Sequence, residues 1–305
     1  MVPAYDRTLF PFRPLKITPP LQFLEIALKF RSAITVCAVP QAASGPFVFH
    51  GDFFENIHLS KKIGFDAVEL FLPDAKQVSA METKTVLDSL SLDLAAVGSG
   101  AGWVVHQLSL TSNDESNRQK AIVFVKSLIE WAGPWSAPVI IGSMQGRISV
   151  GEDRSEVLKR LGDSLEVLSE YARAQHKSKL FFEPLNRYET NLFTRISDAA
   201  NWLESRSLDN VLILADLFHM NIEESDLAES ILSCNRNGKN WIGHTHWADS
   251  NRQAMGFGHT DTAPIAQALM SIGYDGYLSG EVFPAPDSNT AARQTLKTIQ
   301  ASFSK

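Results

Sequence analysis

Two hydrophobic patterns alternate along the chain: short apolar runs, and longer stretches with helical spacing. The short runs are rich in Val, Ile, Leu and Phe and are bounded by polar, Gly or Pro positions, which is typical of buried β-strands. Eight such runs predict strands at residues 33–39, 67–72, 92–97, 139–142, 180–183, 211–216, 241–246 and 277–282. Eight is the number of strands in a closed parallel α/β barrel.

The stretches between these runs place apolar residues three or four positions apart, which predicts amphipathic helices. Val157, Leu161, Leu165 and Leu168 form such a stripe within residues 154–175. Other helices are predicted at residues 53–63, 116–131, 197–205, 226–234, 264–272 and 290–303. Regular alternation of strands and helices predicts an α/β fold, a single-domain (β/α)8 TIM barrel over residues 33–305.

An N-terminal extension, residues 1–32, precedes the predicted barrel domain. Its residues 21–30 are amphipathic, which predicts a short helix over the bottom of the barrel. A doubly wound open sheet would give the same alternation of strands and helices. However, no GxGxxG fingerprint follows the first strand, and a length of 305 residues is ordinary for one closed barrel. The barrel is therefore favoured.

Composition narrows the functional class. The chain has 44% hydrophobic and 20% charged residues, which indicates a folded globular protein. Its formal charge of −6 gives no general attraction to nucleic acid or to anionic lipid. Two cysteines, an N-terminal region with charges and prolines in place of an apolar signal, and the lack of a membrane-length apolar run favour a cytoplasmic protein.

Four polar residues close apolar runs at a regular interval. Glu183, Asp216, His246 and Glu281 are separated by 33, 30 and 35 residues, about one strand plus one helix. Successive units of a parallel barrel bring such positions to the carboxyl ends of the strands, so we expect the four side chains to meet. One imidazole and three carboxylates suit one divalent metal ion, Mn²⁺ first and Mg²⁺ or Co²⁺ as alternatives.

Each of these residues also has a purely structural interpretation. Glu183 could form a rim salt bridge, and Asp216 could cap the helix that follows it. His244 and His246 share one face of their strand, and only the outer one lies at the mouth. We therefore expect His246 to be the ligand and His244 to lie behind it, as an orienting or packed histidine.

The two glutamates also have a predicted role in chemistry. They follow the fifth and eighth strands, which lie about 135° apart around a barrel axis. Glu183 and Glu281 would then approach a central ligand from different sides. This favours proton removal by one and proton return by the other, through a cis-enediolate next to a metal-bound carbonyl.

Four segments carry a family resemblance: EPLNRYET (183–190), ADLFHMNIEE (215–224), GHTHWADSNRQAMGFGHTD (243–261) and GYDGYLSGEVF (273–283). They resemble D-tagatose/D-psicose 3-epimerases and related sugar isomerases of the xylose-isomerase-like TIM barrel group. The resemblance implies the same four metal ligands and the same acid/base pair. It further implies that Glu189, His219 and Arg252 contact the substrate, whereas without it they read equally well as surface charge pairs.

Two departures from the family pattern concern the substrate. The 3-epimerases carry Gly-Glu before the Asn-Arg pair, where this chain has Ala248 and Asp249. The exit of the first strand, residues 38–41, also lacks the aromatic wall expected of the ketohexose enzymes. The chemistry is therefore better defined than the sugar.

The leading hypothesis is an isomerase, a keto-sugar 3-epimerase or sugar isomerase, acting on a small sugar. No Gly-rich phosphate cradle is evident, which leans toward an unphosphorylated sugar. An aldose–ketose isomerase and an inosose-type dehydratase are alternatives on the same scaffold. An apurinic endonuclease would need more metal ligands and a basic groove, and a non-catalytic sugar-binding protein would leave both glutamates unexplained. A homodimer or homotetramer stays open.

Overall fold

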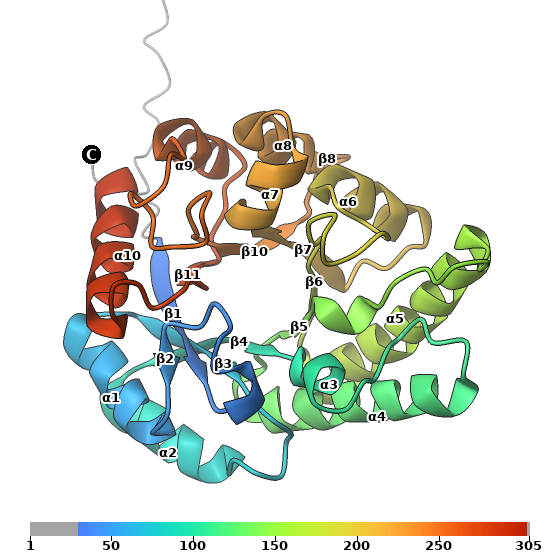
Figure 1. Cartoon of the computed structure of the whole chain (residues 1–305), viewed down its shortest axis with the longest axis horizontal. Coiled ribbons are helices and arrows are strands. Elements are labelled where there is room, and N and C mark those ends of the chain that lie inside the picture. The colour runs from blue at the N-terminus through green and yellow to red at the C-terminus, as the bar shows by residue number, and fades with distance from the viewer. Residues whose placement is uncertain (1–29, 304–305) are drawn as a thin grey trace, which may run out of the picture.

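A closed parallel barrel forms the centre of the molecule (Figure 1). The computed structural model describes residues 30–303. Neighbouring strands pair in parallel, and the last pairs with the first, so the sheet closes and the predicted TIM barrel is confirmed. The strands of the barrel are β1 (Arg31–Cys37), β3 (Ala67–Phe71), β4 (Asp93–Gly98), β5 (Val139–Ile141), β6 (Leu180–Phe182), β7 (Val211–Asp216), β10 (Ile242–His246) and β11 (Tyr277–Gly280).

A ring of helices surrounds the strands (Figure 1). It consists of α1 (Phe53–Ile63), α2 (Ala80–Leu90), α4 (Glu115–Ala132), α5 (Arg154–His176), α6 (Ile196–Ser205), α8 (Leu227–Ser233), α9 (Thr262–Ser271) and α10 (Ser288–Phe303). An aspartate side chain accepts a backbone N–H at the start of several of them, for example Asp153 at α5 and Asp261 at α9. Such caps satisfy amide groups that have no partner inside the helix.

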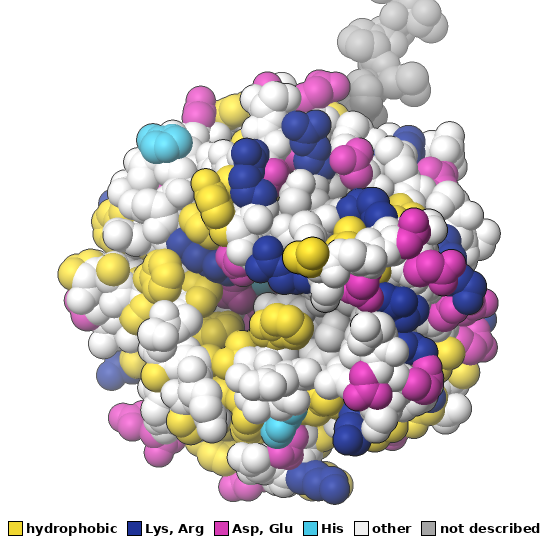
Figure 2. Space-filling view, turned by 45° about the vertical axis from the view of Figure 1, so that its right-hand side comes forward, with side chains coloured by type: hydrophobic (Ala, Val, Ile, Leu, Met, Phe, Trp, Pro, Cys, Tyr) yellow, Lys and Arg dark blue, Asp and Glu magenta, His cyan; other side chains and the backbone are white. Residues whose placement is uncertain are grey.

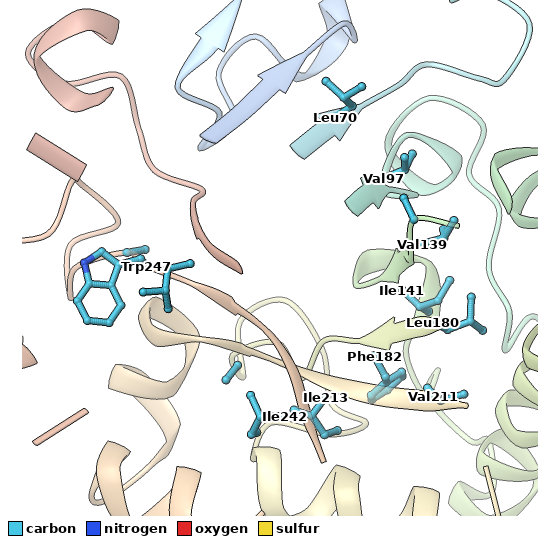
Figure 3. Packing of buried hydrophobic residues seen from close by; sticks show 14 of the residues in the cluster. Leu70, Val97, Val139, Ile141, Leu180, Phe182, Val211, Ile213, Ile242 and Trp247 are labelled. Atoms are coloured by element: carbon cyan, nitrogen blue, oxygen red, sulfur yellow. The ribbon is translucent and has the colours of Figure 1, made fainter. Parts of the chain in front are cut away.

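Strand side chains alternate between two apolar layers. Outward positions such as Leu180, Phe182, Val211 and Ile213 pack against the helices, and Figure 3 shows this layer running from β3 to β10. Inward positions fill the barrel, with a layer formed by Ala96, Ile140, Phe181, Leu212 and Leu214. Because strand side chains have a period of two, the residues that follow these inward positions, Glu183 and Asp216, also point into the barrel.

Several smaller elements were not predicted from the sequence. Helix α2 is one, and the short helices α3 (Ala101–Val104) and α7 (Leu217–Glu223) are others, both following strands at the barrel mouth. The 3-10 turns η1 (Pro40–Ala42), η2 (Gly133–Trp135) and η3 (Ser143–Gln145), strand β2 (Phe49–His50) and the hairpin of β8 (Asn235–Arg236) and β9 (Lys239–Asn240) complete the set.

The N-terminal boundary of the barrel differs slightly from the prediction. Strand β1 begins at Arg31, inside the predicted extension 1–32. The rest of that extension, with most of the helix predicted at 21–30, lies outside the described residues and stays a prediction. Among residues 30–303, no helix has the length and apolar character needed to cross a bilayer.

Candidate active site

The structure brings Glu183, Asp216, His246 and Glu281 together at the carboxyl ends of β6, β7, β10 and β11. One oxygen or nitrogen atom of each side chain lies within 4.8 Å of those of the other three. Glu183, Asp216 and His246 are buried, and the Glu281 side chain is 13% exposed. A cluster of three carboxylates and one imidazole in a largely buried place needs a compensating positive charge.

Asp216 caps a helix and also faces the cluster. Its Oδ1 accepts the backbone N–H of Phe218 at 2.7 Å and caps helix α7. Its Oδ2 lies 3.2 Å from His246 Nδ1, inside the cluster. Burial alone would raise the pKa of Asp216, but His219 and His246 outweigh it and hold this pKa below its usual range.

His246 is oriented by Glu69, a residue that the sequence analysis missed. His246 Nε2 lies 3.1 Å from Glu69 Oε1, so its other nitrogen, Nδ1, faces Asp216, Glu183 and Glu281. Histidine ligands commonly donate their second nitrogen to a carboxylate in this way. The signal was a charged residue at an inward position of an apolar run, AVELF, since such a residue needs a buried partner.

His244 lies behind His246, one layer deeper in the barrel. Its Nε2 hydrogen-bonds Glu69 Oε2 at 2.7 Å, and its ring stacks on Phe181 with centroids 5.3 Å apart. Burial lowers the pKa of His244, which favours the neutral ring. Glu69, His244 and His246 form the second of two potential metal-holding groups among residues 30–303. In this group the two carboxylate oxygens and the Nε2 atoms of both histidines are already engaged in hydrogen bonds with one another.

The cluster fits a divalent cation. Glu183 Oε1 is buried and accepts no hydrogen bond, although it lies 3.5 Å from His246 Nδ1. Burial raises the pKa of Glu183 to about 8, and the neighbouring Glu281 and Asp216 add to the rise. Burial likewise raises the pKa of Glu281. A bound cation would neutralise these carboxylates in place of protons, and oxygen-rich sites suit hard divalent ions.

His219 presents one N–H to the cluster. Its Nδ1 accepts the backbone N–H of Asn186 at 3.2 Å, so that nitrogen is unprotonated and the proton of the neutral ring resides on Nε2. Nε2 lies 3.8 Å from both Glu183 Oε1 and Asp216 Oδ2 and has no hydrogen-bond partner. Burial lowers the pKa of His219 to about 4, so the ring is neutral near pH 7.

Arg252 connects the cluster to the rim of the site. Its guanidinium donates to Glu281 Oε2 at 2.9 Å and to Glu189 Oε1 at 3.3 Å, and lies over the ring of Phe218. The structure therefore places all three residues implied by the resemblance, Glu189, His219 and Arg252, at the edge of the same cluster. They interact with each other or with the cluster through ion-pair distances of at most 3.9 Å.

The loop that carries Arg252 is built around the buried carboxylate of Asp249. Asp249 accepts four backbone N–H groups, from Ser250, Gly256, Gly258 and Thr260. These bonds lower the pKa of Asp249 to about 2, although burial alone would raise it. Arg252 itself has a φ of +59°, a left-handed conformation that L-residues rarely adopt. The Asp249 carboxylate thus ties four points of the loop together.

A cavity of about 270 Å³ opens above the cluster. Glu69, Glu183, His246, Arg252 and Glu281 line its floor, and Figure 2 shows a hollow in this face with acidic side chains at the bottom. Phe47 and Phe71, with ring centroids 4.4 Å apart, also line the cavity. The aromatic wall that residues 38–41 lack is therefore supplied from other positions. The lining thus combines charged and aromatic side chains, as in many small-molecule pockets.

Gly142 provides space for Glu183. A Cβ built on Gly142 would overlap Glu183 Oε2, so any larger residue would displace the carboxylate. Gly142 ends the run predicted as the fourth strand, but in the structure β5 stops at Ile141. The backbone therefore leaves strand geometry at the point where it must make room for the glutamate of the next strand.

Comparison with known proteins agrees with this geometry. A 3-dehydro-D-guloside 4-epimerase of Escherichia coli is 28% identical over 83% of this chain and 95% of its own length. A D-psicose 3-epimerase of Ruminiclostridium cellulolyticum is 27% identical over 77% of this chain and 80% of its own length. The crystal structure of the D-psicose 3-epimerase of Clostridium cellulolyticum, with D-tagatose, has the same fold, with a TM-score of 0.74, 21% identity and coverage of 90% and 98%.

These relatives are sugar epimerases, which supports the prediction of an enzyme of the isomerase class. The family model described as "Xylose isomerase-like TIM barrel" matches residues 57–302, most of the described chain. That range includes every strand-end residue of the cluster as well as Glu69 and Arg252. The protein therefore belongs to the xylose isomerase-like TIM barrel family.

Proposed function

We propose that the protein is a metal-dependent epimerase of a keto sugar. It would invert the carbon next to the ketone by proton transfer between Glu183 and Glu281. The observation that carries the proposal is the placement of these two carboxylates, which reach one cluster from β6 and β11, with β7 and β10 between them. A psicose 3-epimerase and a 3-dehydro-sugar 4-epimerase both invert a carbon next to a ketone, so this chemistry is common to both relatives.

The proposed metal ligands are Glu183, Asp216, Glu281 and His246, the last through Nδ1. Nε2 of His246 is not available because it faces Glu69. Oxygen-rich ligation suits Mn²⁺, with Mg²⁺ or Co²⁺ as alternatives. When bound, the ion would polarise the ketone and so make the neighbouring C–H more acidic.

The protein's own groups would do the remaining work. One glutamate removes the proton from one face of the carbon, and the other returns a proton to the opposite face. The Nε2–H of His219 is free to donate to a substrate oxygen. Arg252, which donates to Glu281, would hold that carboxylate in place, and Glu189 would accept a substrate hydroxyl at the rim. Phe47 and Phe71 would exclude water from part of the cavity.

Turnover in D₂O tests the proposal. Mn²⁺-loaded enzyme is incubated with free ketoses, their phosphates and 3-dehydro sugars, and the products are identified by NMR. We expect an inverted product that carries one deuterium at the inverted carbon, and activity on unphosphorylated sugars. Hydrogen transfer without solvent label, together with an aldose product, would establish an aldose–ketose isomerase instead, and loss of water would establish a dehydratase. Cytoplasmic location and assembly as a homodimer or homotetramer stay predictions.

A further inference from the structure

A chain of cavities continues from the metal-site cavity toward the outer rim of the barrel. Ser143 and Glu189 line the metal-site cavity and also a second cavity of about 200 Å³. Trp103 and Arg147 line this second cavity and also a third, of about 450 Å³. The second cavity thus shares wall residues with both the first and the third. Pockets for drug-sized ligands have volumes of about 300–1,000 Å³, so the inner cavity alone is small and the whole cleft is not.

The residues at the junction of the two outer cavities suit a sugar ring. Trp103 is 39% exposed, although the neighbouring Ala101 and Gly102 are buried. A flat, partly exposed indole packs well against the C–H face of a pyranose, and its apolar surface is otherwise unfavourable in water. Arg147 is exposed and has a single hydrogen bond, a 3.4 Å contact to the Tyr188 carbonyl, so most of its donors are free within residues 30–303.

The outer cavity is polar rather than apolar. Gln107 and Asn113 line it, and their side-chain amides have no hydrogen-bond partner among the described residues. Glu152, also on its wall, is paired with Arg160. The free amides and the Arg147 guanidinium can hydrogen-bond sugar hydroxyls, and the carboxylate on the wall is already neutralised by Arg160. This lining therefore suits a neutral sugar better than an apolar or cationic ligand.

The junction is rigid. Leu108 N–H bonds the Gly102 carbonyl at 2.8 Å, and Leu110 N–H bonds the Met144 carbonyl at 2.9 Å, which joins the α3 segment to η3. A Cβ on Gly102 would overlap Met144 Sδ, so α3 lies in direct contact with η3. These contacts fix the segment that carries Trp103, which lines the same two cavities as Arg147, and Figure 1 shows α3 near the ends of β4 and β5. A rigid aromatic and polar surface is what a binding subsite requires.

We propose that Trp103 and Arg147 form a subsite for a second sugar ring, so that the substrate is a glycoside or disaccharide whose keto ring occupies the metal-site cavity. Trp103 would stack on the outer ring, and Arg147, Gln107 and Asn113 would bind its hydroxyls. This inference rests on the proposed epimerase function for the inner ring. The outer subsite itself needs neither the ketone nor the metal ion.

Matched substrates test the subsite. Initial rates are measured with 3-dehydro-D-glucose and with the disaccharide in which the same keto ring is linked to a second glucose. We expect kcat/KM to be at least about tenfold higher for the disaccharide. Trp103→Ala and Arg147→Ala should each remove most of this advantage, while kcat/KM for the monosaccharide stays within about twofold of wild type. Leu232→Ala on α8, whose side chain is also 39% exposed, is the matched control and should keep the full preference.

Two results would overturn the subsite: equal kcat/KM for both substrates in the wild type, or an equal loss for both substrates in Trp103→Ala. A binding measurement separates this failure from failure of the proposed function. Calorimetric titration with maltose and with glucose needs no turnover, and we expect maltose to bind at least about tenfold more tightly and to lose this advantage in Trp103→Ala. If no keto sugar is converted, the epimerase proposal fails, and the maltose titration alone then decides the subsite.

Discussion

Glu183 and Glu281 differ in their surroundings although both end a barrel strand. Glu281 accepts a hydrogen bond from Arg252, whereas Glu183 Oε1 has no partner. A carboxylate that is paired with a guanidinium is held in one rotamer and one charge state more strongly than an unpaired one. The two residues are therefore suited to separate tasks, one on each face of the substrate.

Replacing either glutamate by glutamine should cut turnover by at least about a hundredfold, the usual scale for loss of a general acid or base. Each variant should still exchange the substrate proton with D₂O on the face that keeps its glutamate, without inversion. NMR of the recovered substrate measures this exchange. Glu224→Gln, a carboxylate bonded to Ile196 N–H and Ser230 outside the site, is the control and should retain activity. Inversion at an undiminished rate in Glu183→Gln or Glu281→Gln would contradict the assignment.

The two neighbouring histidines should behave differently. His246→Ala removes the nitrogen that faces the cluster and should abolish metal retention, whereas His244→Ala removes only a partner of Glu69 and should retain the ion with lower activity or stability. Metal content after dialysis, with circular dichroism as a check on folding, measures this. Retention in His246→Ala together with loss in His244→Ala would reverse the assignment.

Both cysteines should react slowly in the folded protein. Burial raises the pKa of Cys37 to about 11 and that of Cys234 to about 12, so almost no thiolate exists near pH 8. Their side chains are also buried and unpaired as free thiols. In urea, a disulfide-exchange reagent should label both cysteines rapidly. In the native protein, it should label each of them much more slowly. Rapid labelling of the native enzyme would show that the segments around these residues open readily.

At the scale of elements, the loop after β10 is organised around the side chain of Asp249. Four backbone N–H groups converge on Asp249, and their bonds keep residues 250–260 folded over the site. Arg252 belongs to this loop, and its N–H also bonds the Asp249 carbonyl at 2.8 Å. The position of Arg252 over Glu281 thus depends on a residue that does not itself line the metal-site cavity.

Asp249→Asn should destabilise the protein by about 1–3 kcal/mol at pH 7, because an amide cannot accept from four N–H groups as a carboxylate does. The pKa of Asp249 in the fold, about 2, lies below the value near 3.9 of an unfolded aspartate. Its contribution is therefore complete above about pH 4 and disappears as the pH falls toward 2. Urea unfolding of both proteins from pH 7 to pH 2.5 should show the difference shrinking at the acid end. A difference that does not change with pH would contradict the carboxylate's role.

Elements with their own hydrophobic period were predictable, and elements fixed by distant contacts were not. The strands at 211–216 and the helix at 53–63 have the predicted bounds, because charged or small residues end clear apolar patterns there. A helix was predicted at 197–205, but α6 begins at Ile196 after Arg195, whose side chain makes no cap. The backbone N–H of Ile196 instead donates to the carboxylate of Glu224. Glu224 lies 28 positions away, and no local pattern indicates this contact.

The candidate site divides in the same way. The four cluster residues were predictable because each ends a strand and parallel strands end together. Glu69 was missed: its charge within an apolar strand indicates a buried partner, but no local pattern identifies that partner as His244 and His246, about 175 positions later in the chain. The Trp103–Arg147 junction was also not predictable, since both residues lie in connections whose conformation depends on packing between α3 and η3.

At the scale of the whole molecule, a barrel with a charged mouth should gain stability from its cation. The cluster gathers three carboxylates in a largely buried place, and a ligand that binds only the folded state stabilises it by about 2.7 kcal/mol at a hundredfold excess over Kd. Adding Mn²⁺ to chelator-treated protein should therefore raise Tm by at least about 5 °C. Scanning calorimetry measures this, and His246→Ala should show no such rise. A similar rise in the variant would place the ion elsewhere.

The shared side chain of Asp216 makes two functions inseparable. One oxygen starts helix α7 and the other faces the proposed ion, and His219 lies on the first turn of that same helix. The length of the side chain sets both distances at once. A glutamate could reach an ion but would no longer cap the helix, and an asparagine could cap the helix but would lack the charge. No single exchange at this position keeps both the cap that places the imidazole of His219 and the charge that faces the ion, so only aspartate serves both roles at this corner of the barrel.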